Sequence, residues 1–227
     1  MTKHTDLDNL TDAALSHVPF DGWTEATFAA AIADTGLDPA DARILCPHGA
    51  VDLAVAFHHR GDDAMVARLE ETDLSALRFR DRIATAIRFR LEVVPDREVV
   101  RRGTTLFALP QNAAEGAKLI WGTADRIWNA LGDTSQDANW YSKRATLSAV
   151  YGATVLYWLG DDSPDHSATW EFLDRRIDDV MQIEKLKGKA RENPLLKRLL
   201  EGPGQVLSRV RAPSRSDRTD LPGQWRK

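Results

Sequence analysis

The chain has 227 residues, of which 43% are hydrophobic and 28% charged, a balance typical of a globular protein with a sizeable core. Its net charge of −4 combines an acidic beginning, net −10 over residues 1–75, with a basic end, net +7 over residues 181–227, which argues for different partners at the two ends. The single cysteine, Cys46, excludes an intrachain disulfide framework, and because no run of about eighteen apolar residues is present, no membrane-spanning helix is expected.

Helical periodicity runs through most of the chain, and no segment alternates as a strand would. Glycine and proline residues separate the periodic segments. The pattern therefore predicts an all-α fold. Its helices are expected at about residues 6–17, 25–34, 39–46, 50–71, 75–93, 96–108, 112–131, 139–159 and from 163 to at least 181. Thr24, Asp38 and Asp137 are expected to cap helix N-termini, because their side-chain oxygens can accept hydrogen bonds from free backbone N–H groups.

The composition changes after Met181. Residues 185–189 are rich in lysine and are expected to form a solvated linker. Beyond them, apolar residues recur at helical spacing on either side of Gly202-Pro203-Gly204, so two short amphipathic helices with a bend are expected there. Such a basic, amphipathic segment favours an anionic membrane surface, and the alternative is a tail that packs on the body of the same chain. The side chains predicted to contact the membrane are Leu195, Leu196, Leu199, Leu200, Val206, Leu207 and Val210.

This pattern divides the chain into four parts. Residues 1–75 are expected to form an acidic head resembling a helix-turn-helix, and residues 76–184 a larger, ligand-binding helical bundle. Residues 185–211 would be the linker and membrane-contacting segment. The tail 212–227 is rich in proline, serine and charge, so disorder is expected.

The head raises the question of DNA binding, since its first three helices have the lengths and the glycine turn of a helix-turn-helix. DNA affinity depends on lysine and arginine side chains that neutralise phosphates. The segment at the position of a recognition helix, 39–46, offers one cation, Arg43, close to Asp38 and Asp41. The charge therefore argues against DNA binding and favours a head that only packs, with a ligand-responsive transcriptional regulator as the alternative function.

No residue pattern indicates catalysis. His58 and Asp62 lie one turn apart and could ligate a metal, but no second ligand pair accompanies them, so no metal site is predicted. Cys46 precedes a proline and has no evident base, which favours a small buried residue. Nucleophile elbows and phosphate loops are absent from the sequence. We therefore predict no catalytic residues and no cofactor, and a protein that is not an enzyme.

The middle helices carry more large apolar side chains than one narrow helical seam needs. A mostly apolar cavity of several hundred Å3 is expected between them. The side chains predicted to line it are Phe79, Ile83, Ile87, Phe107, Leu119, Trp121, Ile127, Trp128 and Tyr151. Trp140 and Tyr141 differ from these, because adjacent helical residues point about 100° apart and cannot both face one core. They suit a partner-binding surface as well as a core.

Four motifs together resemble a known family. They are His17-Val18-Pro19-Phe20-Asp21-Gly22-Trp23, Leu109-Pro110, Asp137-Ala138-Asn139-Trp140-Tyr141-Ser142-Lys143-Arg144-Ala145, and Ser163-Pro164 with Trp170-Glu171-Phe172-Leu173. Over about residues 17–180, the sequence resembles the lipid-binding accessory proteins of ubiquinone (coenzyme Q) biosynthesis. The resemblance implies a TetR-like all-α fold, a homodimer, and a non-catalytic protein that binds an isoprenoid or quinone lipid and does not bind nucleic acid.

The resemblance also implies a partner, the di-iron demethoxyubiquinone hydroxylase. The surface that would meet it corresponds to Trp140 and Tyr141, with Ile127 across the loop. Arg144 would hold this surface in place by pairing with an acidic neighbour such as Asp137. Family members contact the membrane through a C-terminal amphipathic helix.

The compartment is also inferred from the sequence. Eukaryotic members of this family carry a mitochondrial transit segment, and residues 1–10 have neither the arginine content of a transit peptide nor an apolar signal core. A bacterial-type cytoplasmic protein, peripherally associated with the membrane, is therefore expected.

Overall fold

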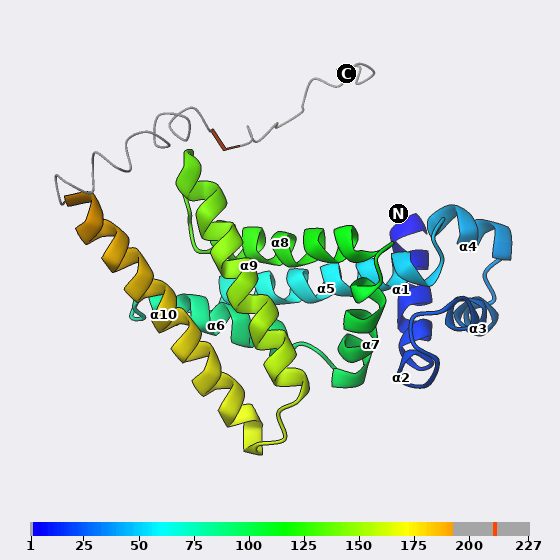
Figure 1. Cartoon of the computed structure of the whole chain (residues 1–227). Coiled ribbons are helices and arrows are strands. Elements are labelled where there is room, and N and C mark those ends of the chain that lie inside the picture. Colours follow the sequence, from blue (N-terminus) through cyan, green and yellow to red (C-terminus); the bar gives the residue numbers. More distant parts are fainter. Residues whose placement is uncertain (1, 193–210, 213–227) are drawn as a thin grey trace.

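The computed structural model describes residues 2–192 and 211–212, with side chains for residues 5–182 and 211–212. Within these ranges every regular element is a helix, which confirms the predicted all-α fold (Figure 1). The elements are α1 (Thr2–Leu15), α2 (Val18–Asp21), α3 (Glu25–Thr35), α4 (Pro39–Leu45), α5 (Ala50–Glu71), α6 (Phe79–Glu92), α7 (Arg97–Ala108), α8 (Ala113–Ala130), α9 (Ala138–Leu159), the 3-10 helix η1 (Pro164–His166) and α10 (Ser167–Glu192). In the described part of the chain, no helix is long and apolar enough to cross a bilayer.

Side-chain caps fix the starts of three predicted helices. The hydroxyl of Thr24 accepts from the backbone N–H of residue 27 at 3.3 Å, and the carboxylate of Asp38 accepts from the N–H of residue 40 at 2.8 Å. Asp137 caps α9 in the same way, at 2.9 Å from the N–H of residue 139. Each cap satisfies a donor that would otherwise lack a partner at the helix end.

Three segments differ from the prediction, and the first of them, α1, begins at Thr2 and not at residue 6. The first helix was expected to continue to residue 17, but α1 ends at Leu15 and the chain enters α2, where Pro19 occupies the first turn and needs no N–H partner there. The helix expected from residue 75 begins only at Phe79, because the guanidinium of Arg82 binds the carbonyl oxygens of Ser75 and Leu77 and holds that segment in turns.

The third difference lies at the basic run 185–189, which was expected to be a linker. It forms part of α10, which continues to Glu192. Lysine and leucine are good helix formers, and a charged run is as compatible with a solvated helix as with a linker. The membrane-contacting side chains expected between residues 195 and 210 lie outside the described residues, so that contact stays a prediction.

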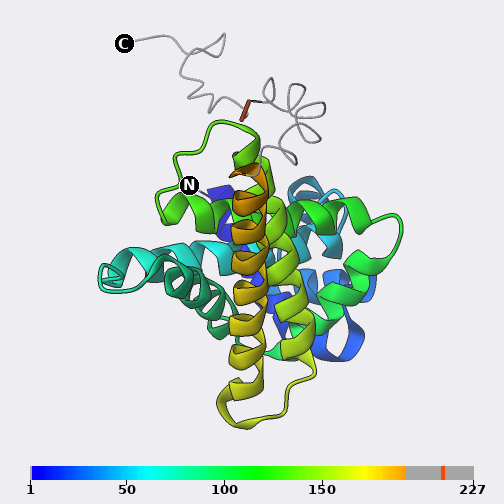
Figure 2. The same ribbon diagram turned by 60° about the vertical axis from the view of Figure 1, so that its left-hand side comes forward.

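Two buried clusters form the interior. The larger one gathers side chains from the second half of α5 and from α6, α8, α9 and α10. The smaller one joins α1–α4, the first half of α5 and α7. Figures 1 and 2 show α9 and α10 side by side, with α9 packed across α8 and α10 against α6, and with α1–α4 at one end of α5. The helix α5 contributes to both clusters. The domain boundary predicted at residue 75 stays a prediction.

Candidate functional site

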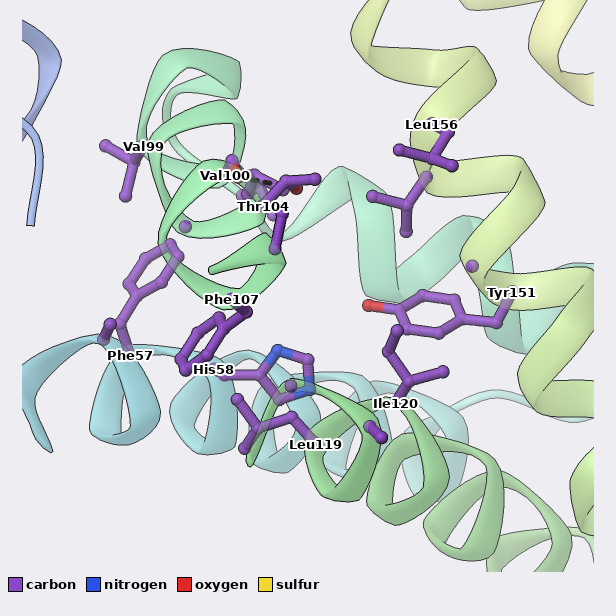
Figure 3. Close-up of a pocket in the computed structure, with 18 of the residues that line it drawn as sticks. Phe57, His58, Val99, Val100, Thr104, Phe107, Leu119, Ile120, Tyr151 and Leu156 are labelled. Carbon is purple, nitrogen blue, oxygen red and sulfur yellow. Dashed lines mark hydrogen bonds between the residues drawn. The ribbon is translucent and has the colours of Figure 1, made fainter. Parts of the chain in front are cut away.

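A cavity of about 520 Å3 lies where α5, α6, α7, α8 and α9 meet. Its walls are mostly apolar and include Phe57, Phe107, Leu119 and Ile120 (Figure 3). The lining residues that are also solvent-exposed mark its mouth, between the α7–α8 connection and α9. They are Ala108, Ala113, Ala117 and Leu156. Small side chains on one side of this mouth leave the cavity accessible.

A glycine allows α8 to form one wall. A Cβ added at Gly116 would lie 2.7 Å from the Cβ of Phe107, closer than side chains approach one another. Because glycine has no Cβ, α8 packs directly against α7, and the Phe107 ring lines the cavity (Figure 3). The wall therefore depends on a close helix approach that a larger residue would prevent.

One side of the cavity is polar and is held by a buried hydrogen-bond network. His58 Nε2 lies 2.8 Å from Thr123 Oγ1, and Thr123 Oγ1 lies 2.9 Å from Asp62 Oδ1. Asp62 in turn accepts from Arg90 Nε at 2.7 Å, and the second amino group of Arg90 donates to the carbonyl of residue 58 at 3.1 Å. The Asp62 and Arg90 side chains are 1% and 4% exposed, so this ion pair is buried and fully engaged.

The sequence suggested His58 and Asp62 either as metal ligands or, in preference, as part of a polar helix end, and it gave no sign of Arg90 and Thr123. The structure uses all four as a structural network. The sequence signal that could have indicated this network is the four-residue spacing of His58 and Asp62, which places both on one face of α5. The partners come from α6 and α8, and no local pattern connects those helices with α5.

Burial controls the charge of the His58 imidazole. Desolvation lowers its pKa to about 4, although the carboxylate of Asp62 acts in the opposite direction. The imidazole is therefore neutral at pH 7. Burial likewise raises the pKa of the Tyr151 phenol, which stays protonated.

This depressed pKa predicts a pH dependence of stability. His58 has an ordinary pKa of 6.5 when unfolded, so between about pH 6.5 and 4 the unfolded chain binds a proton that the folded chain does not. The free energy of unfolding should therefore fall by about 2 kcal/mol between pH 7.5 and pH 5 through this group. Urea titrations of the wild type and of His58→Gln at both pH values measure the difference. His59→Gln, one residue along, should keep the wild-type profile, and identical profiles for all three proteins would contradict the assignment.

The network also explains a glycine within α5. A Cβ at Gly61 would lie 2.7 Å from Arg90 Cζ, and this guanidinium cannot move away without breaking its buried bonds. We expect Gly61→Ala to lower the free energy of unfolding by roughly 1–3 kcal/mol, although alanine normally stabilises a helix.

Gly122 on α8 provides the matched control. A Cβ there meets nothing within 4 Å, so Gly122→Ala should raise stability by about 0.5–1 kcal/mol. Chemical denaturation of both variants measures these changes in the free energy of unfolding. A gain in stability for Gly61→Ala would show that the Arg90 side chain moves easily to make room for the added Cβ.

The side chains predicted to line one cavity do not gather in one place. Phe107, Leu119 and Tyr151 line the cavity described above. A separate hollow of about 210 Å3 is bounded by Phe79, Ile83 and Trp128, together with residues of α9 and α10. Ile87 is fully buried in the larger core. The reason is geometric: helical spacing groups residues by face, and successive faces of one helix meet different neighbours.

Trp121, also predicted to line the cavity, instead joins a cluster formed between the middle of α8 and the first turn of α9. Trp121, Trp140 and Tyr141 form this aromatic cluster, with ring centroids 4.7 Å apart for the last two and 6.0 Å apart for the two tryptophans. Tyr141 is 37% exposed. The Tyr141 hydroxyl donates to the carbonyl of Arg211 at 3.3 Å, so part of the chain near the C-terminus contacts this cluster.

The buried side chain of Arg144 packs against the Trp140 ring of the aromatic cluster. Its guanidinium lies 3.9 Å from the ring centroid of Trp140, and it donates to Asp125 at 2.5 Å and to Asp133 at 3.0 Å. Burial acts to raise the pKa of Asp133, but hydrogen bonds from Lys143, Ser135 and Arg144 outweigh it and hold that pKa well below its ordinary range. The site is thus a fixed arrangement of charges beside two half-buried tryptophan rings and the exposed ring of Tyr141.

Two expectations for this surface need correction. Ile127 was expected to contact the partner, but it is 0% exposed and packs in the larger core, because it lies on the α8 face that meets α9. Asp137 was expected to pair with Arg144. It caps α9 instead and binds Asn139, while Asp125 and Asp133 reach Arg144 from α8 and the loop.

The head offers little positive charge for DNA. The guanidinium of Arg43 on α4 is 2.7 Å from the carboxylate of Glu25 on α3, so its charge is already neutralised. Cys46, at the end of α4, is buried, and its burial raises the pKa of the thiol to about 11. It is therefore a protonated core residue at neutral pH.

Comparison with known proteins points to one family. The COQ9 family model matches residues 113–184, which span α8, α9, η1 and much of α10. The probable ubiquinone biosynthesis protein coq9 of Dictyostelium discoideum is 31% identical over 186 residues, covering 79% of this chain and 61% of that protein. Human ubiquinone biosynthesis protein COQ9 is 32% identical over 185 residues, covering 75% and 56%. The chain thus spans about three fifths of the length of these curated relatives.

Among solved structures, the TetR transcriptional regulator from Nitrosomonas europaea ATCC 19718 is similar, with a TM-score of 0.62 at 19% sequence identity. The alignment covers 76% of this chain and 95% of the regulator, which shows a shared fold.

The comparisons also correct the predicted compartment. The curated relatives are mitochondrial proteins, so the expectation of a bacterial-type cytoplasmic protein is wrong. That expectation relied on the composition of residues 1–10, which does not determine the compartment. With a matching domain over residues 113–184 and relatives over most of its length, the chain carries a COQ9 domain, is homologous to the COQ9 ubiquinone biosynthesis proteins and has a TetR-like fold.

Proposed function

We propose that this protein is a non-catalytic accessory protein that binds a prenylated quinone intermediate and presents it to a di-iron hydroxylase. Its COQ9 relatives indicate a role in ubiquinone biosynthesis. The observation that carries the proposal is the cavity of about 520 Å3, whose size and apolar walls suit part of an isoprenoid lipid. Transfer of such a lipid out of a bilayer is costly because its apolar surface would meet water. An apolar cavity lowers that cost.

The accessory role is supported by how the candidate reactive groups are used. The Cys46 thiol is protonated, and Cys46 is not among the residues that line the cavity. His58 and Asp62 are engaged with Thr123 and Arg90, an arrangement that fixes side chains in place. In this proposal the chain supplies binding and orientation, and the chemistry takes place on the hydroxylase.

The aromatic cluster is the proposed surface for the hydroxylase. Trp and Tyr side chains dominate the energetics of many protein interfaces, and the cluster is anchored from below by Arg144. A homodimer, as the family resemblance implies, is also part of the proposal. The alternative, a TetR-type regulator, is disfavoured by the neutralised Arg43 on α4.

A cavity-filling variant tests lipid binding. Gly152 lines the cavity, and a Cβ added there would only just touch Ile120, at 3.9 Å, so a longer side chain extends into the space. We expect Gly152→Leu to weaken binding of a short-chain prenylated quinone at least about tenfold. Gly122→Leu makes the same change where nothing lies within 4 Å and should bind like the wild type.

Native mass spectrometry with lipid extraction, followed by a fluorescence titration, gives the readout. The wild type should carry an isoprenoid lipid or bind one at micromolar concentrations. Purified protein that is empty and shows no isoprenoid affinity in this range would overturn the proposal. Equal affinity of the wild type and Gly152→Leu would place the lipid elsewhere.

A further inference from the structure

We infer that the polar side of the cavity is a binding site for a phenolic hydroxyl group, formed by His58 Nδ1 as acceptor and the Tyr151 hydroxyl as donor. This inference rests on the proposed function and adds to it the chemical class of the ligand's ring, namely a phenol or hydroquinone in preference to a quinone. It follows from the direction of the hydrogen bonds behind the cavity wall.

The direction is fixed at Asp62. A carboxylate bound to the Arg90 guanidinium can only accept hydrogen bonds. Thr123 Oγ1 lies 2.9 and 3.2 Å from the two carboxylate oxygens and 3.2 Å from the Leu119 carbonyl oxygen, so its single proton points toward one of these acceptors, of which Asp62 Oδ1 is the nearest. Thr123 Oγ1 must therefore accept a hydrogen bond from His58 Nε2, which lies 2.8 Å away. His58 Nε2 therefore carries the imidazole proton.

The other imidazole nitrogen is left as an acceptor. Because burial keeps His58 neutral at pH 7, Nδ1 has no proton when Nε2 has one. Both side-chain partners of the ring in the described part of the chain, Thr123 at 2.8 Å and Asp62 at 3.7 Å, face Nε2, and the imidazole also forms a backbone hydrogen bond with Leu119. Figure 3 shows the imidazole on the cavity side of α5, with one ring edge turned into the space. The protein thus presents a fixed acceptor to the ligand.

Tyr151 supplies the complementary group. Its ring comes from α9, on the opposite wall, and Figure 3 shows its hydroxyl pointing into the cavity. Burial raises its pKa, while Arg90 and a side-chain hydrogen bond with Thr123 act in the opposite direction, and the phenol stays protonated and able to donate. Thr123 is thus a neighbour of both polar groups, which places them at one end of the cavity.

An acceptor and a donor together match a hydroxyl, which donates to one and accepts from the other. A quinone carbonyl can only accept, so it would use Tyr151 and leave His58 Nδ1 unsatisfied in a buried site. An unpaired buried polar group weakens binding. Leu119 and Ile120 border this end and would contact the faces of the ring, while the prenyl chain would extend toward the mouth at Leu156.

The test compares three ligands that share one geranyl chain: a geranyl phenol, its methyl ether and geranylbenzene. The ether keeps the oxygen but cannot donate. The wild-type protein should bind the phenol about tenfold more tightly than either of the others. In Tyr151→Phe and His58→Phe this preference should fall below about threefold, while affinity for geranylbenzene should stay within about threefold of the wild type.

Matched controls lie beside both residues. Tyr157→Phe removes a hydroxyl from the same helix, at a ring that stacks on Phe172 outside the cavity. His59→Phe makes the histidine change at an exposed position. Both should keep the preference for the phenol. Tyr151→Phe removes one oxygen atom only, so the test remains decisive even if His58→Phe unfolds, which circular dichroism would reveal.

The outcomes separate the inference from the proposed function. If the wild type binds all three ligands equally, or if Tyr151→Phe keeps the full preference, the hydroxyl site is overturned while lipid binding stands. If the wild type binds none of the three, both are overturned. A preference for the phenol that is lost in Tyr151→Phe and kept in Tyr157→Phe supports the site.

Discussion

Replacing Arg144 by methionine is expected to lower the free energy of unfolding by about 3 kcal/mol or more. The Arg144 side chain is 1% exposed and pairs with Asp133, whose side chain is 2% exposed. Methionine keeps much of the volume of the stem but leaves the Asp133 carboxylate buried with Lys143 as its one remaining cation among the described partners. Removal of one member of a buried ion pair is costly because the remaining charge stays desolvated.

An exposed ion pair on the same side of the fold serves as the control. Arg126 on α8 pairs with Asp63 on α5, and these side chains are 37% and 66% exposed. Arg126→Met should therefore cost at most about 1 kcal/mol. Urea denaturation of both variants gives the comparison. If Arg144→Met lowers the free energy of unfolding no more than Arg126→Met does, the buried ion pair does not stabilise the N-terminal end of α9. Arg144 would then not hold the aromatic cluster in place.

The second large effect concerns the proposed partner. Trp140→Ala and Tyr141→Ala should each weaken binding to the demethoxyubiquinone hydroxylase at least about tenfold, since truncation of a central Trp or Tyr typically costs ~2 kcal/mol or more. Both rings belong to the aromatic cluster, and neither fills the cavity. Lipid affinity should therefore stay unchanged in both variants. Surface plasmon resonance with purified hydroxylase in detergent measures the loss.

Tyr157→Ala controls for the removal of any half-exposed ring from α9. Tyr157 is 39% exposed and stacks on Phe172 at 4.5 Å, away from the aromatic cluster. It should bind the hydroxylase normally. Normal binding by Trp140→Ala and Tyr141→Ala, or unfolding of both, would show that the rings serve the fold and not a partner. Tyr141→Phe separately removes only the hydrogen bond to the carbonyl of Arg211.

The two effects are linked through Arg144. Its guanidinium packs on the Trp140 ring and bonds to the carbonyl of the same residue at 3.2 Å. A change at Arg144 should therefore disturb the cluster as well as the fold. Stability and partner binding have to be measured on the same variants to separate the two contributions.

Local sequence determined the helices and several of their ends. Period and punctuation predicted the all-α fold, and Thr24, Asp38 and Asp137 cap the helices that they were expected to cap. These features depend on contacts within a few residues, so the local sequence contains the physical information they need. The run 137–145 likewise carried the resemblance to the family whose domain matches residues 113–184.

The tertiary structure alone decided which groups meet. Helical spacing places His58 and Asp62 on one face of α5, but the packing of α6 and α8 against that face brings Arg90 and Thr123 to them. Helix packing likewise buries Ile127 and places Trp121 in the aromatic cluster. It also brings Asp125 and Asp133 into contact with Arg144. The physical reason is that periodicity fixes the direction of a side chain relative to its own helix, whereas its neighbour depends on how whole helices pack.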